Sequence, residues 1–350
     1  MNIEQIKTLI ENQMRKIFSE ERQRNCSHSL QHECVDIMED FVLGPGKRIR
    51  PLSVLAFFIG AGGNITERED VLRVSCSMEF LHAATLIHDD IMDEDETRRN
   101  KPTPLKYFLD KYKNNNIDEI TSKFVFISKS ASYATSIAIM LGNLLYSMAI
   151  RNTIMKDQRI QLEMLDLFSG LNYGQIIDVS EIVTIDDYYL NIMKKTAIFF
   201  KTTATIGLML AERSDEDVEN GKIWGEHFGL AFQMRDDLLD IREDESKMRM
   251  IGSDIIEGRK TIVIFTALED NVLNEEEKSF VKKTIEMKQK LIDDNDSFQK
   301  LLNILRGKPS QIVQEKIKEH HKIAIEALEK LHLIPEVFEY LKSLTNLLLK

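Results

Sequence analysis

Apolar residues recur at every third or fourth position along almost the whole chain, the spacing that places them on one face of an α-helix. Runs of alternating β-branched residues, which are typical of strands, are nearly absent. The pattern therefore predicts an all-α protein. The expected helices cover residues 2–20, 29–43, 48–61, 67–94, 121–154, 158–181, 186–212, 215–243, 255–268, 275–290, 296–305, 310–332 and 335–349.

Gly, Pro and Asn gather between these ranges and predict the loops, at residues 44–46, 60–64, 100–104, 114–116 and 307–309. No linker rich in Gly, Ser or Pro divides the chain, so we expect residues 1–350 to form one large helical domain with a single core. The charged stretch 274–300 is expected to be an outer, solvated helical hairpin without chemistry of its own.

One stretch is long enough to span a membrane, because residues 130–150 carry no charge. It contains several Ser, Thr and Asn residues, however, which suit a helix buried on all sides of a bundle better than lipid. The start of the chain mixes charged residues into an amphipathic pattern and lacks the apolar core of a signal peptide. We therefore expect no transmembrane segment and a cytoplasmic protein.

Composition narrows the class of protein further. The chain has 43% hydrophobic and 29% charged residues with 15 Gly and 6 Pro among 350, which excludes a disordered chain. The net charge of −11 argues against nucleic acid as a partner. The three cysteines, Cys26, Cys34 and Cys76, fit neither a disulfide framework nor a zinc site.

Two acidic clusters share the pattern DDxxD, at residues 89–93 and 236–240, and each ends a long apolar helix. Residues four apart share a helix face, so each cluster presents two carboxylates together. A solvated helix end explains one such cluster well but two poorly. Oxygen ligands without His or Cys select hard ions, and Mg²⁺ combines one or two carboxylates with water and substrate phosphates. The clusters therefore predict a magnesium-dependent enzyme with a phosphorylated substrate.

Basic residues gather in four short segments, at residues 47–51, 98–99, 194–195 and 259–260. Arg offers a planar fork for phosphate oxygens and Lys a point charge, so groups facing the metal-loaded carboxylates would enclose a diphosphate. Any one pair taken alone is better explained as ordinary surface charge.

Residues 40–265 resemble the trans-isoprenyl diphosphate synthases, or polyprenyl synthetases. The first part of the resemblance is Gly46 to Pro51, Glu79 to His82, the first DDxxD and Thr97 to Arg99. The second part is Gly174 to Asp178, Lys195 to Ala197, Gly229 to Gln233 before the second DDxxD, and Gly252 to Thr261. Each motif is weak alone, but their order and spacing together are specific.

The resemblance implies a helical bundle in which the two aspartate clusters face each other across a deep central cavity. Three Mg²⁺ ions, with Mn²⁺ as a possible substitute, would bind an allylic diphosphate there. Asp89, Asp93 and Asp236 would ligate these ions, and Asp90, Asp237 and Asp240 would complete or support the ligand shells. The allylic diphosphate would be clamped by Arg98, Lys195, Arg259 and Lys260.

The resemblance also implies a metal-free pocket for the second substrate, isopentenyl diphosphate, formed by Lys47, Arg50, His82 and Arg99. The allylic carbon–oxygen bond would break, the double bond of isopentenyl diphosphate would attack the cation, and a proton would pass to the departing diphosphate. Thr196, Gln233 and the backbone carbonyl near Lys195 would orient dipoles toward the cation. The family is generally homodimeric, so a homodimer is expected.

Three residues near these motifs could serve the packing of the protein rather than its chemistry. His82, on an apolar helix, is the kind of residue that is often a core histidine, although its place before the first cluster favours a ligand. His88 is expected to be structural, and Phe232 to belong to the core.

The sequence departs from the family pattern in several places. Pro45 and Asn100 stand where Gly is common, and Met248 and Arg249 replace a frequent Gly-Lys pair. Arg259 replaces the usual Lys, which preserves the charge but changes the reach and geometry of the cation. None of these changes removes an expected metal ligand.

Product length should depend on the side chains one turn below the first cluster, roughly 7 Å along the helix. Short-chain family members carry an aromatic residue there, whereas this chain has Ala84 and Thr85. The growing product could then pass Leu81 toward Met78, with Leu145, Tyr146 or Met148 as a lower stop. We expect an all-trans product of C20 or longer, with C25–C40 favoured.

Three alternatives remain in view at this stage. A farnesyl or geranyl diphosphate synthase would make a shorter product. A class I terpene cyclase would not need Lys47, Arg50 and Arg99. A non-catalytic subunit of a heterodimeric synthase would usually lack the aspartates that this chain retains.

Overall fold

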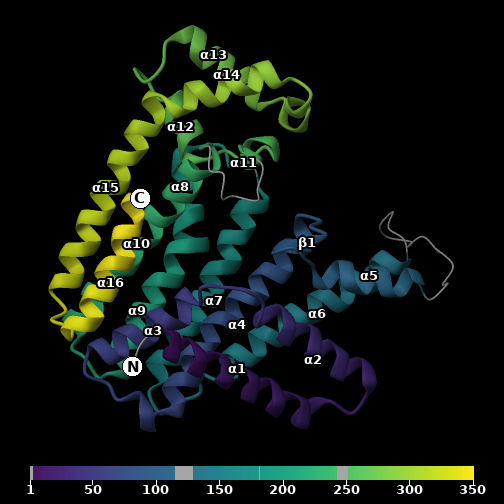
Figure 1. Cartoon of the computed structure of the whole chain (residues 1–350), viewed down its shortest axis with the longest axis vertical. Helices are drawn as coiled ribbons and strands as arrows, with labels where there is room; N and C mark the ends of the chain where they lie inside the picture. The colour runs from purple at the N-terminus through teal and green to yellow at the C-terminus, as the bar shows by residue number, and fades with distance from the viewer. Residues whose placement is uncertain (1–2, 115–128, 181, 243–250) are drawn as a thin grey trace. The chain divides into compact units, whose positions relative to one another are not determined.

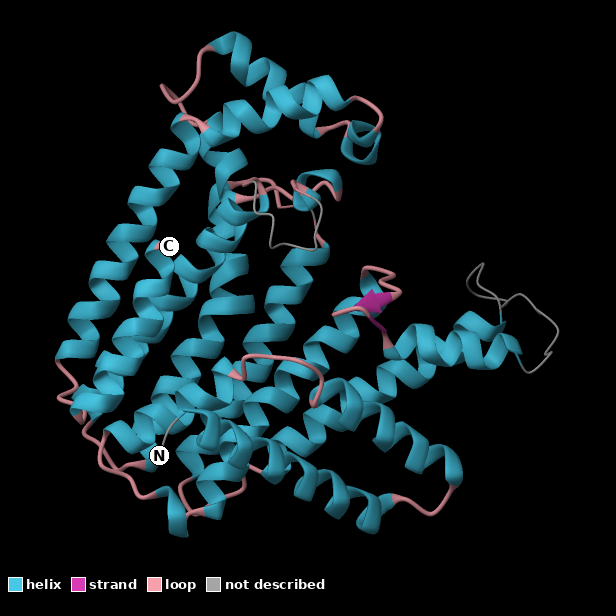
Figure 2. Ribbon diagram, viewed as in Figure 1, coloured by secondary structure: helices cyan, strands magenta, loops and turns pink. Residues whose placement is uncertain are grey.

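The computed structural model describes residues 3–114, 129–180, 182–242 and 251–350, and these are almost entirely helical (Figures 1 and 2). The two strands that it contains form one short antiparallel hairpin, in which β1 (Thr97–Arg98) pairs with β2 (Lys101–Pro102). The predicted all-α class is confirmed.

The chain divides into two compact units. One consists of Met1–Phe168 with Met209–Ala211, and the other of Ser169–Leu208 with Glu212–Lys350. Buried apolar side chains are found in each unit. The single core expected for the whole chain therefore stays a prediction.

The first unit contains the hairpin, a short 3₁₀ turn at Ile65–Glu67 and the N-terminal helices. These helices are α1 (Ile3–Asn25), α2 (Ser29–Val42), α3 (Ile49–Gly60), α4 (Glu69–Met92), α5 (Pro104–Asn114), α6 (Lys129–Arg151) and the first half of α7 (Gln158–Val179).

The second unit contains the rest of α7 and the C-terminal helices. These are α8 (Ile185–Ile192), a π-helical turn (Met193–Ala197), α9 (Ile198–Leu210), α10 (Asp215–Asp240), α11 (Ser253–Ile256), α12 (Ile262–Leu268), α13 (Glu275–Ile285), α14 (Asn295–Arg306), α15 (Lys308–Glu329) and α16 (Pro335–Asn346). Two 3₁₀ turns, Lys288–Ile292 and Leu347–Leu349, complete the unit.

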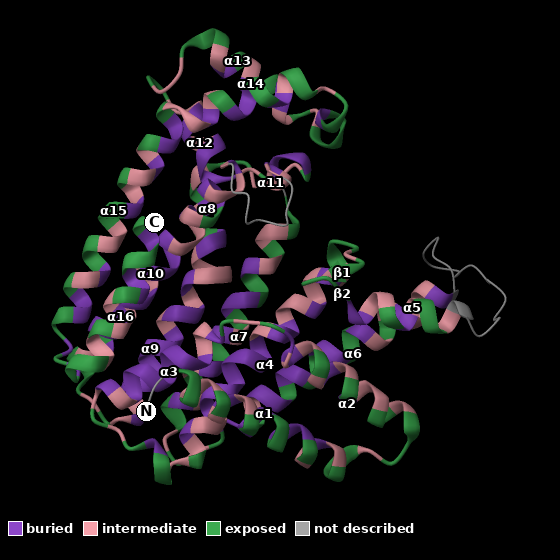
Figure 3. Ribbon diagram, in the orientation of Figure 1, coloured by how far each residue is buried: buried purple, intermediate pink, exposed green. Residues whose placement is uncertain are grey.

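Helix α4 is buried on most of its circumference (Figure 3). It packs against α1, α3 and α6, and residues on successive positions, such as Phe80, Leu81, Ala83 and Ala84, are all buried. A helix that is enclosed on all sides does not show a one-faced apolar stripe. This burial fixes the position of the helix that ends in the first aspartate cluster.

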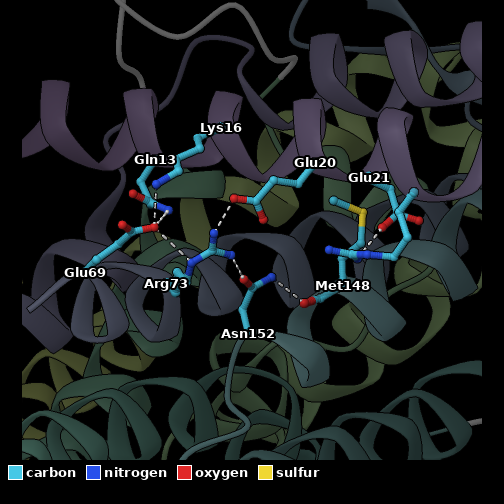
Figure 4. Close-up of polar contacts among 9 residues, drawn as sticks. Gln13, Lys16, Glu20, Glu21, Glu69, Arg73, Met148 and Asn152 are labelled. Carbon is cyan, nitrogen blue, oxygen red and sulfur yellow. Dashed lines mark hydrogen bonds and ion pairs between the residues drawn. The ribbon is translucent and has the colours of Figure 1, made fainter.

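Arg73 ties α4 to two neighbouring elements of the first unit (Figure 4). Its guanidinium donates to Glu20 of α1, to Glu69 at the start of α4 at 3.1 Å, and to the Asn152 side chain after α6 at 2.9 Å. Glu69 also accepts from Lys16 Nζ at 2.7 Å. Because these groups are partly exposed, the network orients the helices more than it stabilises them.

In the second unit, α10 carries glycines at every fourth position, Gly221, Gly225 and Gly229, along the face against α9 and the π-helical turn. A Cβ at Gly225 would lie 2.4 Å from the Lys201 Cα, and one at Gly229 would lie 2.3 Å from the Ala197 Cα. The backbones therefore approach closely only because these positions have no side chain. Another face of α10 packs along α15.

Most predicted helices are confirmed within a few residues at each end, including the outer hairpin, which α13 and α14 form. Helix α5 was missed, although Thr103 accepts from Lys106 N and Pro104 occupies the first turn, a typical helix start. The predicted helix 255–268 is wrong as one element, because the chain breaks at Gly258, where φ is +83°. The predicted segment 121–128, together with Met248 and Arg249, lies outside the described residues.

The charge-free stretch forms most of α6. Within the described residues, one helix, Ser130–Arg151, is long and apolar enough to cross a membrane, but 44% of its apolar window is buried and a core helix would pass the same test. The prediction that it is buried on all sides is wrong. One face packs on α4 and α5, whereas Ile139, Met140 and Leu144 on another face are exposed.

His227 of α10 and His320 of α15 contact each other, with their Nδ1 atoms 2.8 Å apart. One imidazole must donate and the other accept, so the pair is bonded only while it carries at most one extra proton. Burial lowers the pKa of both, and that of His320 falls to about 4. Glu226, which pairs with Lys201 at 3.3 Å, only partly opposes this effect.

We predict that the histidine pair makes the folded protein less stable as the pH falls from about 6.5 toward 4, because the unfolded chain binds protons there that the folded imidazoles do not. The raised pKa values of Asp90 and Asp237 act in the opposite direction over the same range. The contribution of the pair to the free energy of unfolding should fall by about 2 kcal/mol across this range. His320→Gln should flatten that slope in urea titrations, and the exposed His32→Gln should not. Equal slopes for the two variants would contradict the prediction.

Candidate active site

The first aspartate cluster lies at the C-terminal end of α4. Asp89 is in the last turn, and the Asp93 N–H donates to the Asp89 carbonyl at 2.8 Å to close the helix. Asp90 is fully buried and accepts from Arg98 Nε at 2.6 Å. Burial outweighs Arg98 and raises the pKa of Asp90 to about 6.

The position of Arg98 depends on the β-hairpin. Arg99 and Asn100 form the turn, and both have positive φ, 51° and 62°. A turn of this kind favours Gly or Asn, which explains why Asn100 is acceptable where the family commonly has Gly. The turn sends Arg98 back to Asp90 and carries Arg99 toward the start of α3.

Basic side chains gather around Glu79 of α4. Arg48 is buried with φ 52°, and its guanidinium donates to Glu79 at 2.8 Å and to the Gly44 carbonyl at 2.7 Å. A Cβ added at Gly46 would lie 3.1 Å from the Arg48 guanidinium and 3.5 Å from that of Arg99. Gly46 therefore leaves room for two cations to lie close together.

Burial and the repulsion between neighbouring cations lower the pKa values of the basic side chains in this group. Burial lowers the pKa of Arg50 to about 10 against the opposing field of Glu79, and it lowers the pKa of Arg99 in the same way. Burial, Arg50, Arg99 and Arg98 together push the pKa of His82 well below its usual range. Arg48 also pairs with Glu11 at 3.4 Å. The cations of this group still outnumber the two carboxylates, Glu11 and Glu79, and this excess of positive charge favours an added anion.

Lys47 is exposed at the edge of this group. Of the residues expected to bind isopentenyl diphosphate, the structure brings Arg50, His82 and Arg99 into one electrostatic cluster, and Lys47 lies two residues before Arg50. Arg48 and Glu79 were not predicted to take part. The positive φ of Arg48 could not be predicted from the sequence. Glu79, in contrast, lies in the segment Glu79 to His82, which resembles the family.

The second aspartate cluster lies at the C-terminal end of α10. Asp237 is buried and accepts three hydrogen bonds, from Tyr188 Oη at 2.7 Å, Gln233 Nε2 at 3.0 Å and the Ile262 N–H at 3.1 Å. Burial still raises its pKa to about 7. With both oxygens engaged, Asp237 is arranged to support the cluster rather than to ligate a metal.

The other two aspartates of this cluster differ from Asp237. Asp240 accepts from Ser253 Oγ at 2.8 Å and from the Asp254 N–H at 3.2 Å, so it anchors the start of α11. Asp236 is exposed. Asp236 is therefore the member of this cluster most open to a ligand.

The π-helical turn places Lys195 and Thr196. Lys195 Nζ donates to Asp178 of α7 at 2.6 Å, and Thr196 Oγ1 donates to Gln233 Oε1 at 3.0 Å. Gly174 of α7 leaves room for the turn, because a Cβ at this position would lie 3.0 Å from the side chains of Lys194 and Lys195. Thr196, Gln233 and Asp237 thus form one hydrogen-bonded chain. Such turns within helices often mark functional sites.

Arg259 and Lys260 follow the break at Gly258. Arg259 pairs with Glu257 at 3.1 Å, and both side chains are about half exposed. Its backbone N–H donates to the Asp254 carbonyl at 2.8 Å. The predicted role of both residues as a diphosphate clamp stays a prediction.

Comparison with known proteins settles the family. Residues 31–305 match the polyprenyl synthetase family. The chain belongs to this family. It is 31% identical over 293 residues to the short chain isoprenyl diphosphate synthase of Methanocaldococcus jannaschii, covering 81% of this chain and 74% of that protein. It is therefore a prenyltransferase.

Solved structures share the fold of this polyprenyl synthetase. The geranylgeranyl pyrophosphate synthetase of Pyrococcus horikoshii matches with a TM-score of 0.78 and 25% identity, over 99% of this chain and 96% of that one. The geranylgeranyl pyrophosphate synthase of Corynebacterium glutamicum, solved with isoprenyl diphosphate and magnesium, has a TM-score of 0.84 and 22% identity, over 100% and 99%.

Each unit of this prenyltransferase offers aspartate carboxylates to Mg²⁺. Within the described residues, no group of three or more His, Cys, Asp or Glu is arranged to hold a metal by itself. The donors at both clusters are carboxylate oxygens, and Asp90 Oδ2 is buried without a hydrogen bond. These features fit an ion that takes few protein ligands and completes its shell with water and phosphate.

The residues expected to control product length lie on α4. Met78, Leu81 and Ala84 are buried and Thr85 is half-buried, with its hydroxyl donating to the His82 carbonyl at 2.8 Å. On α6, Leu145 and Met148 are buried, and the ring of Tyr146 lies 5.4 Å from that of His88. Tyr146 therefore lies beside the first cluster, which makes it a weaker candidate for the lower stop than Leu145 or Met148.

Two minor predictions concern His88 and Phe232. A Cβ at Gly142 of α6 would overlap the His88 ring, whose Nε2 lies 3.3 Å from the Ile139 carbonyl. His88 thus packs on α6, as its expected structural role requires. The ring of Phe232 lies 5.7 Å from Phe200 and 6.0 Å from Phe228, within an aromatic cluster of the second unit.

Tyr188 is the main residue that sequence reasoning missed. We predict that Tyr188→Phe lowers the free energy of unfolding by about 1–2 kcal/mol, because it removes one of the three donors to a buried carboxylate. Tyr189→Phe, at the neighbouring position, is the matched control and should change it by less than about 0.5 kcal/mol. Urea unfolding measures both, and equal losses would show that the Asp237 bond contributes nothing.

Proposed function

We propose that this prenyltransferase condenses isopentenyl diphosphate with an allylic diphosphate and releases an all-trans prenyl diphosphate of C20 or longer. The observation that carries the proposal is the cation held beside the first aspartate cluster, where Arg98 reaches Asp90 within 2.6 Å next to the group of Arg48, Arg50, His82 and Arg99. One diphosphate would bind through metal at the cluster and another through cations alone.

The proposal requires the two clusters to converge on one allylic diphosphate. Asp89, Asp93 and Asp236 would hold Mg²⁺, three ions in all, with Mn²⁺ as a possible substitute. The magnesium in the solved structure of the Corynebacterium glutamicum synthase supports this choice of metal. Bound Mg²⁺ would neutralise the charge that develops on the departing diphosphate.

The protein's own groups would bind and orient the substrates. Arg98 and Lys195 would hold the allylic diphosphate, joined by Arg259 or Lys260. The Thr196 and Gln233 side chains, fixed by their hydrogen bond and by Asp237, would point oxygen dipoles at the allylic cation. The proton lost from the coupled product would pass to the diphosphate, so the reaction needs no protein base.

The proposed product length follows from α4. Small side chains at Ala84 and Thr85 leave the position below the first cluster without an aromatic residue. Beyond them, a longer chain would pass Leu81 and then Met78. Neither residue is aromatic, and the methionine side chain can change its conformation to make room. A product of C25–C40 is the favoured range within the proposal.

We propose a homodimer that uses the exposed face of α6. Ile139, Met140 and Leu144 on α6 and Leu162 on α7, all in the first unit, are exposed at 38–59%. Met140 and Leu144 are one turn apart on α6, and neighbouring exposed apolar side chains of this kind favour an interaction surface.

Sedimentation tests the dimer. The chain of 40.5 kDa should sediment with twice that mass, and Met140→Lys should shift it toward the monomer because a charge would be buried at the contact. Gln23→Lys, which adds the same single charge at an exposed position on α1, serves as the control. A wild-type monomer at micromolar concentration would contradict the dimer.

The reaction itself has a direct test. Incubation with labelled geranyl or farnesyl diphosphate and Mg²⁺ should give no product until isopentenyl diphosphate is added, and EDTA should abolish turnover, because the carboxylates alone would repel the diphosphate. Chromatography of the extracted products measures both effects. Hydrocarbon made from the allylic substrate alone would indicate a terpene cyclase, and complete inactivity with intact folding would indicate a non-catalytic subunit.

The product-length proposal predicts that Ala84→Phe shortens the product by at least one C5 unit, because the ring would fill the space one turn below Asp89. Overpacking should also cost about 1–3 kcal/mol of stability. Ala83→Phe adds the same volume on another face of α4 and should leave the product length unchanged. An identical product distribution from a folded Ala84→Phe enzyme would rule out this floor.

A further inference from the structure

A small cavity of about 180 Å³ lies in the second unit, against the C-terminal end of α10, the middle of α15 and the last 3₁₀ turn. Four cationic residues line it, Arg235, Arg242, Lys318 and Lys350. Its other walls include the buried side chains of Leu238, Ile317 and Leu348. The cavity therefore combines positive charge with an apolar surface.

Arg235 gives the strongest indication of a ligand. Its Nε atom is buried and has no hydrogen-bond partner among the described residues. A buried donor without an acceptor is costly, and the cost is larger for a charged group. An anion in the cavity would supply the missing acceptor.

The charge of the cavity contrasts with that of the chain, whose net charge is −11. Lys318 pairs with Glu315 at 2.7 Å, but both side chains are more than half exposed, at 58% and 67%. An ion pair exposed to this degree contributes little and leaves the lysine available. The terminal carboxylate of Lys350 offsets the charge of its ammonium group. The local attraction for an anion therefore rests on Arg235, Arg242 and Lys318.

The size of the cavity limits the ligand. Its volume equals about six water molecules at roughly 30 Å³ each, and it is smaller than the roughly 300–1,000 Å³ of drug-sized binding sites. A phosphate-containing head group with a short apolar chain fits this volume, and a C20 chain does not.

The cavity is separate from the proposed active site. Arg235 and Leu238 are three positions apart and share one face of α10, and Arg242 lies two residues beyond the end of this helix. Asp236 and Asp240, which belong to the second aspartate cluster, project from a different face of α10.

We propose that this cavity binds a diphosphate monoester with a short apolar chain at a second site. The choice of a diphosphate rests on the proposed function, because the proposed reaction supplies such molecules, whereas the preference for an anion with an apolar chain rests on the cavity alone.

The test is equilibrium dialysis of the full chain with n-pentyl diphosphate, a saturated compound that cannot condense, in EDTA to remove metal-dependent binding. The wild-type protein should bind two equivalents, one at the cavity and one at the metal-free pocket. Arg235→Gln should weaken the first by at least tenfold, and Lys47→Gln with Arg50→Gln should remove the second. The exposed Lys330→Gln control should bind as the wild type does.

Each outcome is decisive for one site. If Arg235→Gln keeps both equivalents, the cavity proposal is overturned and the proposed function is untouched. If the Lys47 and Arg50 variant keeps both, the proposed isopentenyl diphosphate pocket fails and the cavity stands. Should Arg235→Gln not fold, Arg242→Gln makes the same test. Inorganic diphosphate should bind the cavity at least fivefold more weakly than the pentyl ester, and equal affinity would overturn the role of the apolar chain.

Discussion

Carboxylates crowded at the C-terminal ends of two buried helices are the constraint on which the candidate site depends. The end of a helix already carries partial negative charge, so aspartates there are unfavourable twice over, from the helix dipole and from one another. The chain relieves this differently at each end. Asp90 is paired with Arg98, whereas Asp237 accepts from Tyr188, Gln233 and a backbone N–H. Asp240 accepts from Ser253 and Asp254, and Asp236 is exposed.

The supporting structure is as specific as the aspartates themselves. The hairpin turn at Arg99 and Asn100 aims one arginine at Asp90, and Gly46 lets Arg48 and Arg99 approach the same carboxylate. In the second unit, glycines on α7 and α10 admit the π-helical turn that places Lys195 and Thr196. These positions carry no reactive group, yet substitutions there would move the groups that do.

Much of this could be predicted from the sequence, because helical periodicity and spaced aspartates are local signals. The helix class, the two cluster-bearing helices and the outer hairpin followed from spacing alone. The roles of Arg48 and Tyr188 could not be predicted, since each depends on a contact with a residue distant in the chain, Glu79 or Asp237. The π-helical turn and the break at Gly258 also depend on packing, and the exposed face of α6 shows that a charge-free helix need not be buried within one chain.

The central claim is that both aspartate clusters hold metal on a single diphosphate. A crystal structure of the protein with Mg²⁺ and an unreactive allylic thiodiphosphate tests it most directly. The account predicts that Asp89 and Asp236 each ligate an ion bound to the same diphosphate group, with Arg98 and Lys195 on its oxygens. A diphosphate ligated from one cluster alone, with the other facing solvent, would contradict it.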